Sequence, residues 1–258
     1  MNYIGIDIGS TCAKTVVLNE KKEIIQEFVQ PTGWSSVDTA EEIHQKLQLA
    51  GINLSDDSSC CVATGYGRIS VPYADKTVTE ITCHALGAVH LFQQPDLTVI
   101  DIGGQDTKII QIEQGFVKDF IMNDKCAAGT GRFLEVMANT LSLRPNEMFD
   151  LARLGSDTTI SSMCTVFAES EVIGLIGKGE PKENIAYAIV NSTIRKVAAQ
   201  VSRMNGEMST FCLTGGLCEC EYIREALSKE LGKEVISCPD ARYAGAIGAA
   251  LSAMKVRR

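Results

Sequence analysis

Apolar residues alternate with polar ones in two similar stretches of this chain. Residues 4–18 read IGIDIGSTCAKTVVL, and residues 99–112 read VIDIGGQDTKIIQI. In each stretch an apolar strand ends in an aspartate, a turn of small residues follows, and a second β-branched strand leaves the turn. This order is typical of a β-hairpin with a glycine-rich tip.

The two stretches align without a gap, and three positions carry the same residue in both. They are Asp7 with Asp101, Gly9 with Gly103, and Lys14 with Lys108. Two equivalent hairpins about a hundred residues apart predict a duplicated architecture with two lobes. We place the first lobe at residues 1–95 and the second at residues 96–244.

The remaining segments alternate between helical and strand periodicity, which predicts the α/β class. Helices are predicted over residues 39–50, 79–92, 131–141, 145–154, 168–176, 181–204, 221–231 and 243–254, and strands over residues 60–65, 210–214 and 234–237.

Composition restricts the classes of function. The chain has 258 residues, of which 45% are hydrophobic, and a formal net charge of −8. An acidic chain with 24 lysines and arginines argues against nucleic-acid binding. No apolar run reaches the roughly 20 residues of a membrane helix, and the N-terminus does not resemble a signal peptide. We therefore expect a cytoplasmic protein without a membrane partner.

Ten cysteines are many for such a protein. The spacings contain no CxxC pair, so a self-contained zinc site is not predicted. Most of these thiols are expected to be small buried hydrophobes, namely Cys12, Cys60, Cys61, Cys83, Cys212 and Cys238. We attribute the Cys218-Glu219-Cys220 spacing to chance.

Glycine-rich hairpin tips expose backbone N–H groups that can hold phosphates. Asp7 and Asp101 end their strands beside these tips, where a carboxylate can hold Mg²⁺ through water. A third glycine turn, Gly215-Gly216, follows another strand and would let an adenosine approach the backbone. Any one of these turns alone is explained equally well as a tight turn. Neither GxGxxG opening a helix nor GxxxxGK[ST] is present.

The order IGIDIGST, VIDIGGQDTK and LTGG resembles the actin/hexokinase/Hsp70 ATPase superfamily. The resemblance implies two ribonuclease-H-like lobes that close over ATP and Mg²⁺. It also implies that the C-terminal helix within residues 245–258 packs back on the first lobe.

Two cysteine motifs narrow the resemblance. NDKCAAGTGRFLEVMA around Cys126 and SSMCTVFAESEV around Cys164 are similar to the activator of 2-hydroxyacyl-CoA dehydratases, whose wider family includes benzoyl-CoA reductase ATPase subunits. ATGYGR, EITCHALGA and ARYAGAIGAAL also fit, so the likeness covers essentially the whole chain. It implies an ATP-hydrolysing homodimer with one 4Fe–4S cluster, to which each subunit gives Cys126 and Cys164. A cubane needs four thiolates, which agrees with two from each chain.

The resemblance also implies roles for the glycine loops. Asp7, Asp101 and Gln105 are the expected catalytic residues, with Gln105 orienting water or contacting the γ-phosphate and Asp106 beside it as a weaker alternative. The expected ATP or ADP contacts are Gly9, Ser10, Thr11, Cys12, Ala13, Lys14, Gly103, Gly104, Gln105, Gly215, Gly216 and Arg242. Both cysteines precede predicted helices, whose N-termini favour anionic thiolates.

The function implied is transfer of a low-potential electron from ferredoxin or flavodoxin to an iron–sulfur dehydratase or reductase. The shared cluster is expected to be sensitive to oxygen. The alternatives are a small-molecule kinase without a cluster and a non-catalytic nucleotide sensor. His44, His84 and His90 are expected to be structural or to face solvent, and a solvated helix start is the expected place of Glu169 and Glu171.

Overall fold

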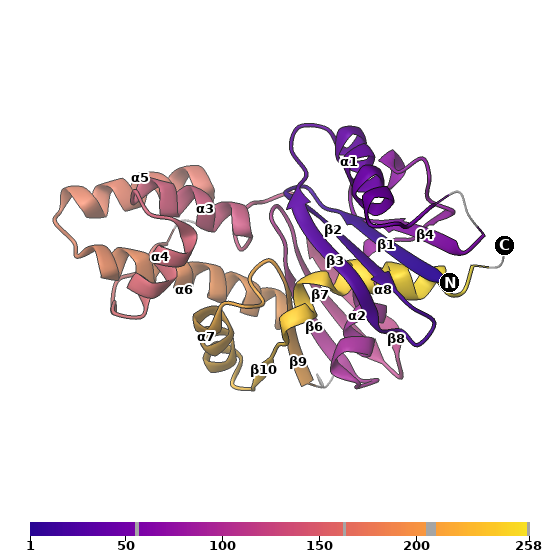
Figure 1. The fold of residues 1–258 in the computed structure, drawn as a ribbon. Coiled ribbons are helices and arrows are strands. Elements are labelled where there is room, and N and C mark those ends of the chain that lie inside the picture. The colour runs from indigo at the N-terminus through magenta and orange to yellow at the C-terminus, as the bar shows by residue number, and fades with distance from the viewer. Residues whose placement is uncertain (55–56, 162–163, 205–209, 257–258) are drawn as a thin grey trace. The chain divides into compact units, whose positions relative to one another are not determined.

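Two five-stranded sheets organise this computed structural model, which describes residues 1–54, 57–161, 164–204 and 210–256 (Figure 1). The first sheet has the order β3-β2-β1-β4-β5 and the second the order β10-β9-β6-β7-β8. The first contains β1 (Asn2–Ile8), β2 (Cys12–Leu18), β3 (Ile24–Pro31), β4 (Ser59–Thr64) and β5 (Lys76–Thr77). The second contains β6 (Leu97–Ile102), β7 (Thr107–Glu113), β8 (Phe116–Asn123), β9 (Thr210–Gly215) and β10 (Val235–Ile236). Read from β3 and from β8, the two orders are the same, so the fold contains the duplication that the sequence predicts.

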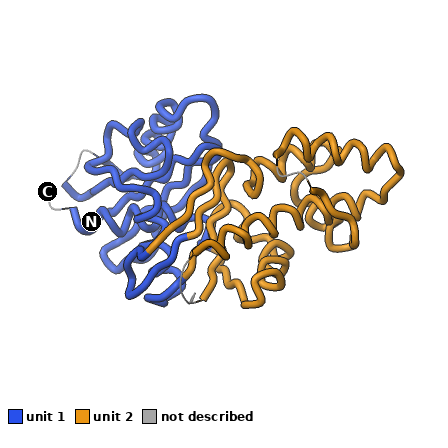
Figure 2. Tube along the Cα trace, turned by 180° about the vertical axis from the view of Figure 1, so that it is seen from behind, with its two compact units in different colours: residues 1–97, 110–118, 240–258 blue, residues 98–109, 119–239 orange. Residues whose placement is uncertain are grey.

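The chain divides into two compact units, coloured separately in Figure 2. Unit 1 comprises residues 1–97, 110–118 and 240–258, and unit 2 comprises residues 98–109 and 119–239. The helices of unit 1 are α1 (Ser36–Leu49), α2 (Glu80–Phe92) and α8 (Ala244–Ala253), with a short 3-10 helix, η1 (Arg68–Ser70). Those of unit 2 are α3 (Gly131–Thr140), α4 (Pro145–Ala152), α5 (Thr165–Gly177), α6 (Lys182–Val201) and α7 (Glu221–Leu231). A second 3-10 helix, η2 (Pro239–Tyr243), leads into α8.

Unit 1 has three layers, because β1 alternates between two buried faces. Ile4, Ile6 and Ile8 pack with the apolar side of α1 in one core cluster. The opposite face of the sheet packs against α8 and α2 in two further clusters. The isoleucines of β1 therefore point toward α1. The alternate positions, which include Gly5 and Asp7, face α2 and α8.

Helix α8 approaches β1 so closely that a side chain cannot fit between them. A Cβ on Gly5 would clash with the carbonyl oxygen of Ala246 and the amide nitrogen of Ala250. This contact holds the C-terminal helix against the first strand of the chain.

The two halves differ most in the connection from the third strand of a sheet to the fourth. In the first half, residues 32–58 join β3 to β4 and contain α1. In the second half, residues 124–209 join β8 to β9 and contain α3, α4, α5 and α6. We call residues 124–209 the inserted segment. It contains both Cys126 and Cys164.

Strands β3 and β8 are not predicted from the sequence. Both lie at the edge of a sheet; every second residue of β3 is exposed, and most residues of β8 are exposed. Apolar residues such as Phe116 and Phe120 on β8 remain exposed, so no buried face gives the strand a readable period. The two-residue strand β5 is too short to leave a pattern.

Candidate functional site

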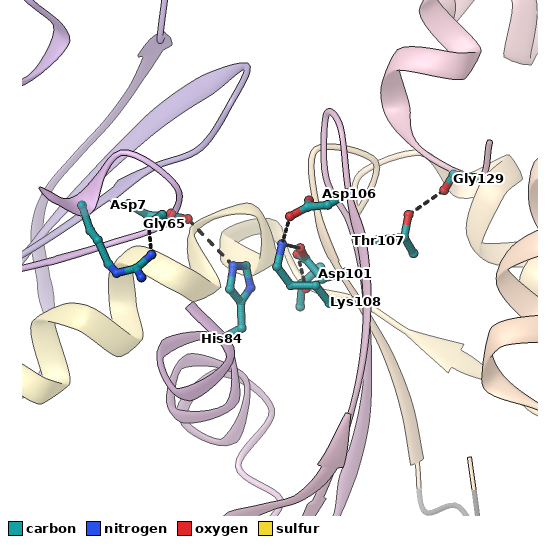
Figure 3. Close-up of polar contacts among 10 residues, drawn as sticks. Asp7, Gly65, His84, Asp101, Asp106, Thr107, Lys108 and Gly129 are labelled. Atoms are coloured by element: carbon teal, nitrogen blue, oxygen red, sulfur yellow. Dashed lines mark hydrogen bonds and ion pairs between the residues drawn. The ribbon is translucent and has the colours of Figure 1, made fainter. Parts of the chain in front are cut away.

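Asp7 lies on β1 one residue before the strand ends, and its carboxylate is 5% exposed. It faces the start of α8, where a Cβ on Gly245 would lie 2.5 Å from Oδ2. The N-terminus of a helix stabilises a negative charge. His84 of α2 is also buried, and its Nε2 lies 3.9 Å from Oδ2 of Asp7. Figure 3 shows His84 directed at Asp7. Our expectation that His84 is structural or faces solvent overlooks this proximity.

A glycine lies against the equivalent carboxylate in each unit. Gly65 follows β4 with φ +84°, and a Cβ there would clash with Oδ1 of Asp7. Gly215 ends β9, also with φ +84°, and a Cβ there would lie 2.9 Å from Oδ1 of Asp101. Positive φ and close approach both require glycine. The Gly215 turn predicted from the sequence therefore has a counterpart at Gly65, within the ATGYGR motif.

Asp101 is held by protein groups on both carboxylate oxygens. The hydroxyl of Thr214 donates a hydrogen bond to Oδ1 over 2.8 Å, and Nζ of Lys108 lies 3.6 Å from Oδ2. The same ammonium donates to Oδ2 of Asp106 over 2.6 Å. Lys108 is 3% exposed, so this cation is compensated by two carboxylates (Figure 3). Both carboxylate oxygens of Asp101 therefore already have partners within the protein.

The two hairpins are alike in backbone and different in side chains. Each tip is closed by a backbone hydrogen bond, from Gly9 N to Cys12 O and from Gly103 N to Asp106 O. By the gapless alignment, Cys12 stands where the second hairpin has Asp106. Lys14 therefore has no aspartate at the position that binds Lys108, and it is only partly buried.

The tips of both hairpins are accessible. Ser10, Thr11 and Gln105 are exposed, while Gly9, Cys12, Lys14, Gly103 and Gly104 are partly buried and Ala13 is buried. In the third turn Gly215 is buried and Gly216 is exposed. A Cβ on Gly216 would meet nothing within 4 Å, whereas one on Gly103 would clash with Oδ1 of Asp106. Backbone N–H groups at exposed turn tips can bind an anion.

Arg242 lies on η2, just ahead of α8, and is partly buried. Its charge acts on Glu27 of β3. The pKa of Glu27 is raised, chiefly by burial and then by the nearby charge of Asp240, while the charge of Arg242 lowers it.

Cys126 is exposed and opens a turn, residues 126–129, in which all four carbonyl oxygens accept a hydrogen bond from a side chain. Asn123 Nδ2 donates to the carbonyls of Cys126 and Ala128 over 2.8 and 3.2 Å. The hydroxyl of Thr130 donates to the carbonyl of Ala127 over 2.6 Å. The hydroxyl of Thr107 donates to the carbonyl of Gly129 over 2.6 Å. The turn is thus fixed to the ends of β7 and β8.

Helix α3 begins beyond this turn, and its first amides are not free. Gly131 N donates to the carbonyl of Gly103 over 2.9 Å, and Arg132 N donates to that of Gly104 over 2.7 Å. The partial positive charge at the start of α3, which we expect to act on Cys126, therefore also acts on the carbonyl oxygens of Gly103 and Gly104 in the second hairpin. The sequence does not predict this contact between the cysteine turn and the second hairpin.

Cys164 is exposed and is itself the N-cap residue of α5. The helix begins at Thr165, three residues earlier than the sequence predicts, so Cys164 lies directly at its positive end. Ser161 donates from its backbone and hydroxyl to the carboxylate of Glu171. Glu169 accepts a hydrogen bond from Thr140 at the end of α3 over 3.2 Å. These two glutamates thus connect the segment before Cys164 and helix α3 to α5, rather than only facing water.

All ten cysteines lie in the described part of the chain, and two of them are exposed, Cys126 and Cys164. Cys60, Cys61, Cys83, Cys212 and Cys218 are buried. Burial raises the pKa of Cys83 to about 12. Burial, Cys238 and Asp101 raise the pKa of Cys212. The thiols of Cys83 and Cys212 therefore stay protonated at neutral pH.

No helix in the described ranges is long and apolar enough to cross a membrane. In the same ranges, no group of three or more His, Cys, Asp or Glu side chains is placed to hold a metal ion.

Comparison with known proteins gives these features a family context. The model of the BadF/BadG/BcrA/BcrD ATPase family matches residues 4–253. The (R)-2-hydroxyglutaryl-CoA dehydratase activating ATPase of Acidaminococcus fermentans is 44% identical over 98% of this chain and 96% of that protein.

Solved structures agree with this. The activator of the 2-hydroxyisocaproyl-CoA dehydratase from Clostridium difficile, with bound ADPNP, matches with a TM-score of 0.89 and 35% identity over 100% of this chain and 99% of that one. A ROK family glucokinase from Streptomyces griseus matches with a TM-score of 0.64 and 16% identity over 99% of this chain and 100% of that one. The second likeness shows the fold alone, and it confirms the predicted actin/hexokinase-type architecture.

Proposed function

Because the chain belongs to the BadF/BadG/BcrA/BcrD ATPase family, we propose that it is the ATP-hydrolysing activator of a 2-hydroxyacyl-CoA dehydratase or of a related reductase. It passes a low-potential electron to an iron–sulfur component of that partner enzyme. The observation that carries the proposal is the placement of Cys126 and Cys164. They are the two exposed cysteines among ten, and each lies ahead of a helix in the inserted segment.

The two thiols fit a shared 4Fe–4S cluster. One chain offers two accessible thiols, and a cubane takes four thiolates. A homodimer with one cluster between its subunits supplies this number through a twofold axis. Cys164 caps the amino end of α5, and a helix N-terminus is a favourable place for an anionic group. One-electron redox chemistry is what such a cluster would supply at this position.

The nucleotide is ATP or ADP, bound through backbone and hydroxyl groups of the glycine turns. The residues proposed are Gly9, Ser10, Thr11, Cys12, Ala13, Lys14, Gly103, Gly104, Gln105, Gly215, Gly216 and Arg242. The exposed tips at Ser10, Thr11 and Gln105 support this assignment. Gln105 would orient the attacking water.

Mg²⁺ would be held through water by Asp7 and Asp101. Asp7 and Asp101 are buried residues, at 5% and 2% exposure, and a buried charge requires a partner. Asp101 already has Lys108 and Thr214, so Asp7 is the carboxylate with the greater capacity for a cation.

The balance of the proposed reaction is simple. ATP and water become ADP and phosphate, one electron arrives from reduced ferredoxin or flavodoxin, and one electron leaves to the partner. The protein's residues bind the nucleotide and hold the two cysteine turns. Nucleotide-dependent movement of these turns biases the transfer in one direction.

The direct test is anaerobic purification followed by determination of iron, molecular mass and ATP hydrolysis. We expect a brown dimer with about four irons per pair of chains. Cys126→Ala and Cys164→Ala should each lose the iron, whereas Cys220→Ala, a partly buried thiol on another turn, should keep it. Protein that stays colourless after iron–sulfide reconstitution, or that phosphorylates a small molecule instead, would overturn the proposal.

A further inference from the structure

The second phosphate hairpin and the Cys126 turn are in direct contact within unit 2. Three hydrogen bonds join them: Thr107 Oγ1 to Gly129 O at 2.6 Å, Gly131 N to Gly103 O at 2.9 Å, and Arg132 N to Gly104 O at 2.7 Å. Two of the three are made by backbone on both sides. The third depends on a single hydroxyl.

That hydroxyl is deeply buried. Thr107 is 0% exposed, as is Thr130 on the other side of the turn, so water cannot replace a lost bond to Gly129. The side chain lies at the first residue of β7, directly after the tip formed by residues 103–106. Figure 3 shows it aimed at the Gly129 carbonyl.

The first hairpin provides an internal comparison. By the gapless alignment, Ala13 stands in the position of Thr107. The first half joins β3 to β4 through α1 and has no cysteine turn at that place. The hydroxyl is therefore present in the copy that carries the inserted segment and absent from the copy that does not. The backbone of the hairpin does not need it.

We propose that Thr107 is a positioning residue that transmits the state of the phosphate hairpin to the turn that holds Cys126. When the residues 103–105 rearrange around a γ-phosphate or its absence, the hydroxyl moves the Gly129 carbonyl with the start of β7. The turn 126–129 moves as a unit, because its other three carbonyls are also bonded to side chains. This inference rests on the proposed function for its physiological meaning, since it supposes nucleotide binding at the hairpin.

The test uses thiol chemistry in cluster-free, full-length protein. Cys126 is alkylated with a maleimide in the presence of Mg²⁺ with ADP and, separately, with a non-hydrolysable ATP analogue. Mass spectrometry of peptides reports Cys126 and Cys164 separately. The variants are Thr107→Val, which removes the hydroxyl at nearly equal volume, and Thr107→Ser, which restores it. Thr98→Val is the matched control, because Thr98 is a fully buried threonine of β6 whose hydroxyl has no hydrogen-bond partner.

In the wild type, the alkylation rate of Cys126 should differ severalfold between the two nucleotides. Thr107→Ser and Thr98→Val should keep this ratio. Thr107→Val should lower it toward one, with the two backbone bonds left in place, while its ADP affinity stays within about twofold of the wild type. A wild-type ratio of one in protein that binds both nucleotides would overturn the inference, and so would a Thr107→Val ratio equal to that of the wild type.

These outcomes are separate from a failure of the proposed function. Wild-type protein that binds no nucleotide, or holds no iron after reconstitution, refutes the proposed function without any measurement on the Thr107 variants. In the loaded dimer, the midpoint potential gives a second readout. Its shift between ADP and the ATP analogue should shrink in Thr107→Val and return in Thr107→Ser, which a general loss of stability would not reproduce.

Discussion

Thr214 at the end of β9 donates its hydroxyl to Oδ1 of Asp101 on β6, although 113 positions separate the two residues in sequence. Both side chains are buried, at 0% and 2% exposure. The bond fixes the carboxylate in one orientation, with Lys108 on its other oxygen.

Removing the Thr214 hydroxyl should therefore leave a buried carboxylate oxygen without its neutral donor. We expect Thr214→Val to lower the free energy of unfolding by about 1–3 kcal/mol, measured by urea denaturation. Thr214→Ser should remain near the wild type. Thr98→Val is the control, since its hydroxyl has no bond to lose. Equal loss in Thr214→Val and Thr98→Val would show that the bond to Asp101 adds nothing.

His84 should influence the metal through Asp7. If Asp7 holds Mg²⁺ through water, the buried imidazole 3.9 Å from Oδ2 helps to keep the carboxylate in position. Loss of such a supporting group costs about 10- to 100-fold in metal affinity. We expect His84→Ala to raise the Mg²⁺ concentration for half-maximal ATP hydrolysis about tenfold or more, and His84→Asn to raise it less. If His84→Ala requires the same Mg²⁺ concentration as the wild type, His84 has no effect on metal binding.

The contact between Gly5 and α8 should tolerate no side chain. We expect Gly5→Ala to lower the stability by about 3 kcal/mol or more, because backbone atoms of Ala246 and Ala250 cannot move aside cheaply. Gly174→Ala in α5 is the control, as a Cβ there meets nothing within 4 Å and alanine favours the helix. Thermal unfolding of both variants measures the difference. A Gly5→Ala protein as stable as Gly174→Ala would mean that α8 is not fixed by this contact.

Thiol reactivity should follow burial. In folded, cluster-free protein at pH 8, iodoacetamide should modify Cys126 and Cys164 and leave Cys83 unmodified. With its pKa raised to about 12 by burial, Cys83 is thiolate in about one molecule in 10,000 at that pH. Peptide mass spectrometry before and after unfolding distinguishes protection from low intrinsic reactivity. Rapid labelling of Cys83 in the folded state would contradict the observed burial.

The same shift predicts a dependence of stability on pH. The folded state keeps the Cys83 proton to a higher pH than the unfolded state, whose thiol titrates near 9.0. Its contribution is complete below pH 9 and is lost as the pH rises toward 12. Between pH 9 and 11 the stability of the wild type should fall more steeply than that of Cys83→Ala. If the stability measured by urea unfolding falls with pH at the same slope in both proteins, Cys83 makes no such contribution.

How far the sequence predicts this molecule depends on how local each signal is. The hairpin around Asp7 and the helix over residues 221–231 are encoded within a few consecutive residues, and the structure contains both. The start of α5 differs by three residues, because none of Thr165, Val166 and Phe167 is buried and the apolar Val166 and Phe167 are exposed, so this turn gives no buried period. Strands β3 and β8 exist through pairing at a sheet edge, which a single sequence does not reveal.

The site shows the same division. Asp101 and Gly215 follow from their strand-and-turn pattern, but their contact depends on β6 and β9 being neighbours. The hydrogen bond between Thr107 and Gly129 joins a hairpin to a turn 22 residues away. Neither stretch of sequence predicts it. The nearest signal in the sequence is the alignment of the two hairpins, in which Thr107 of the second stands where the first has Ala13.

The inserted segment has a consequence for how such a protein can change over evolutionary time. In both sheets the third and fourth strands have two strands between them, so either connection must span roughly 14 Å. Among the described residues, the first half does this with one helix and the second with four. The inserted segment is thus interchangeable in principle. A lineage that replaced residues 124–209 with another module of the same span would keep the nucleotide-binding core and acquire a different output.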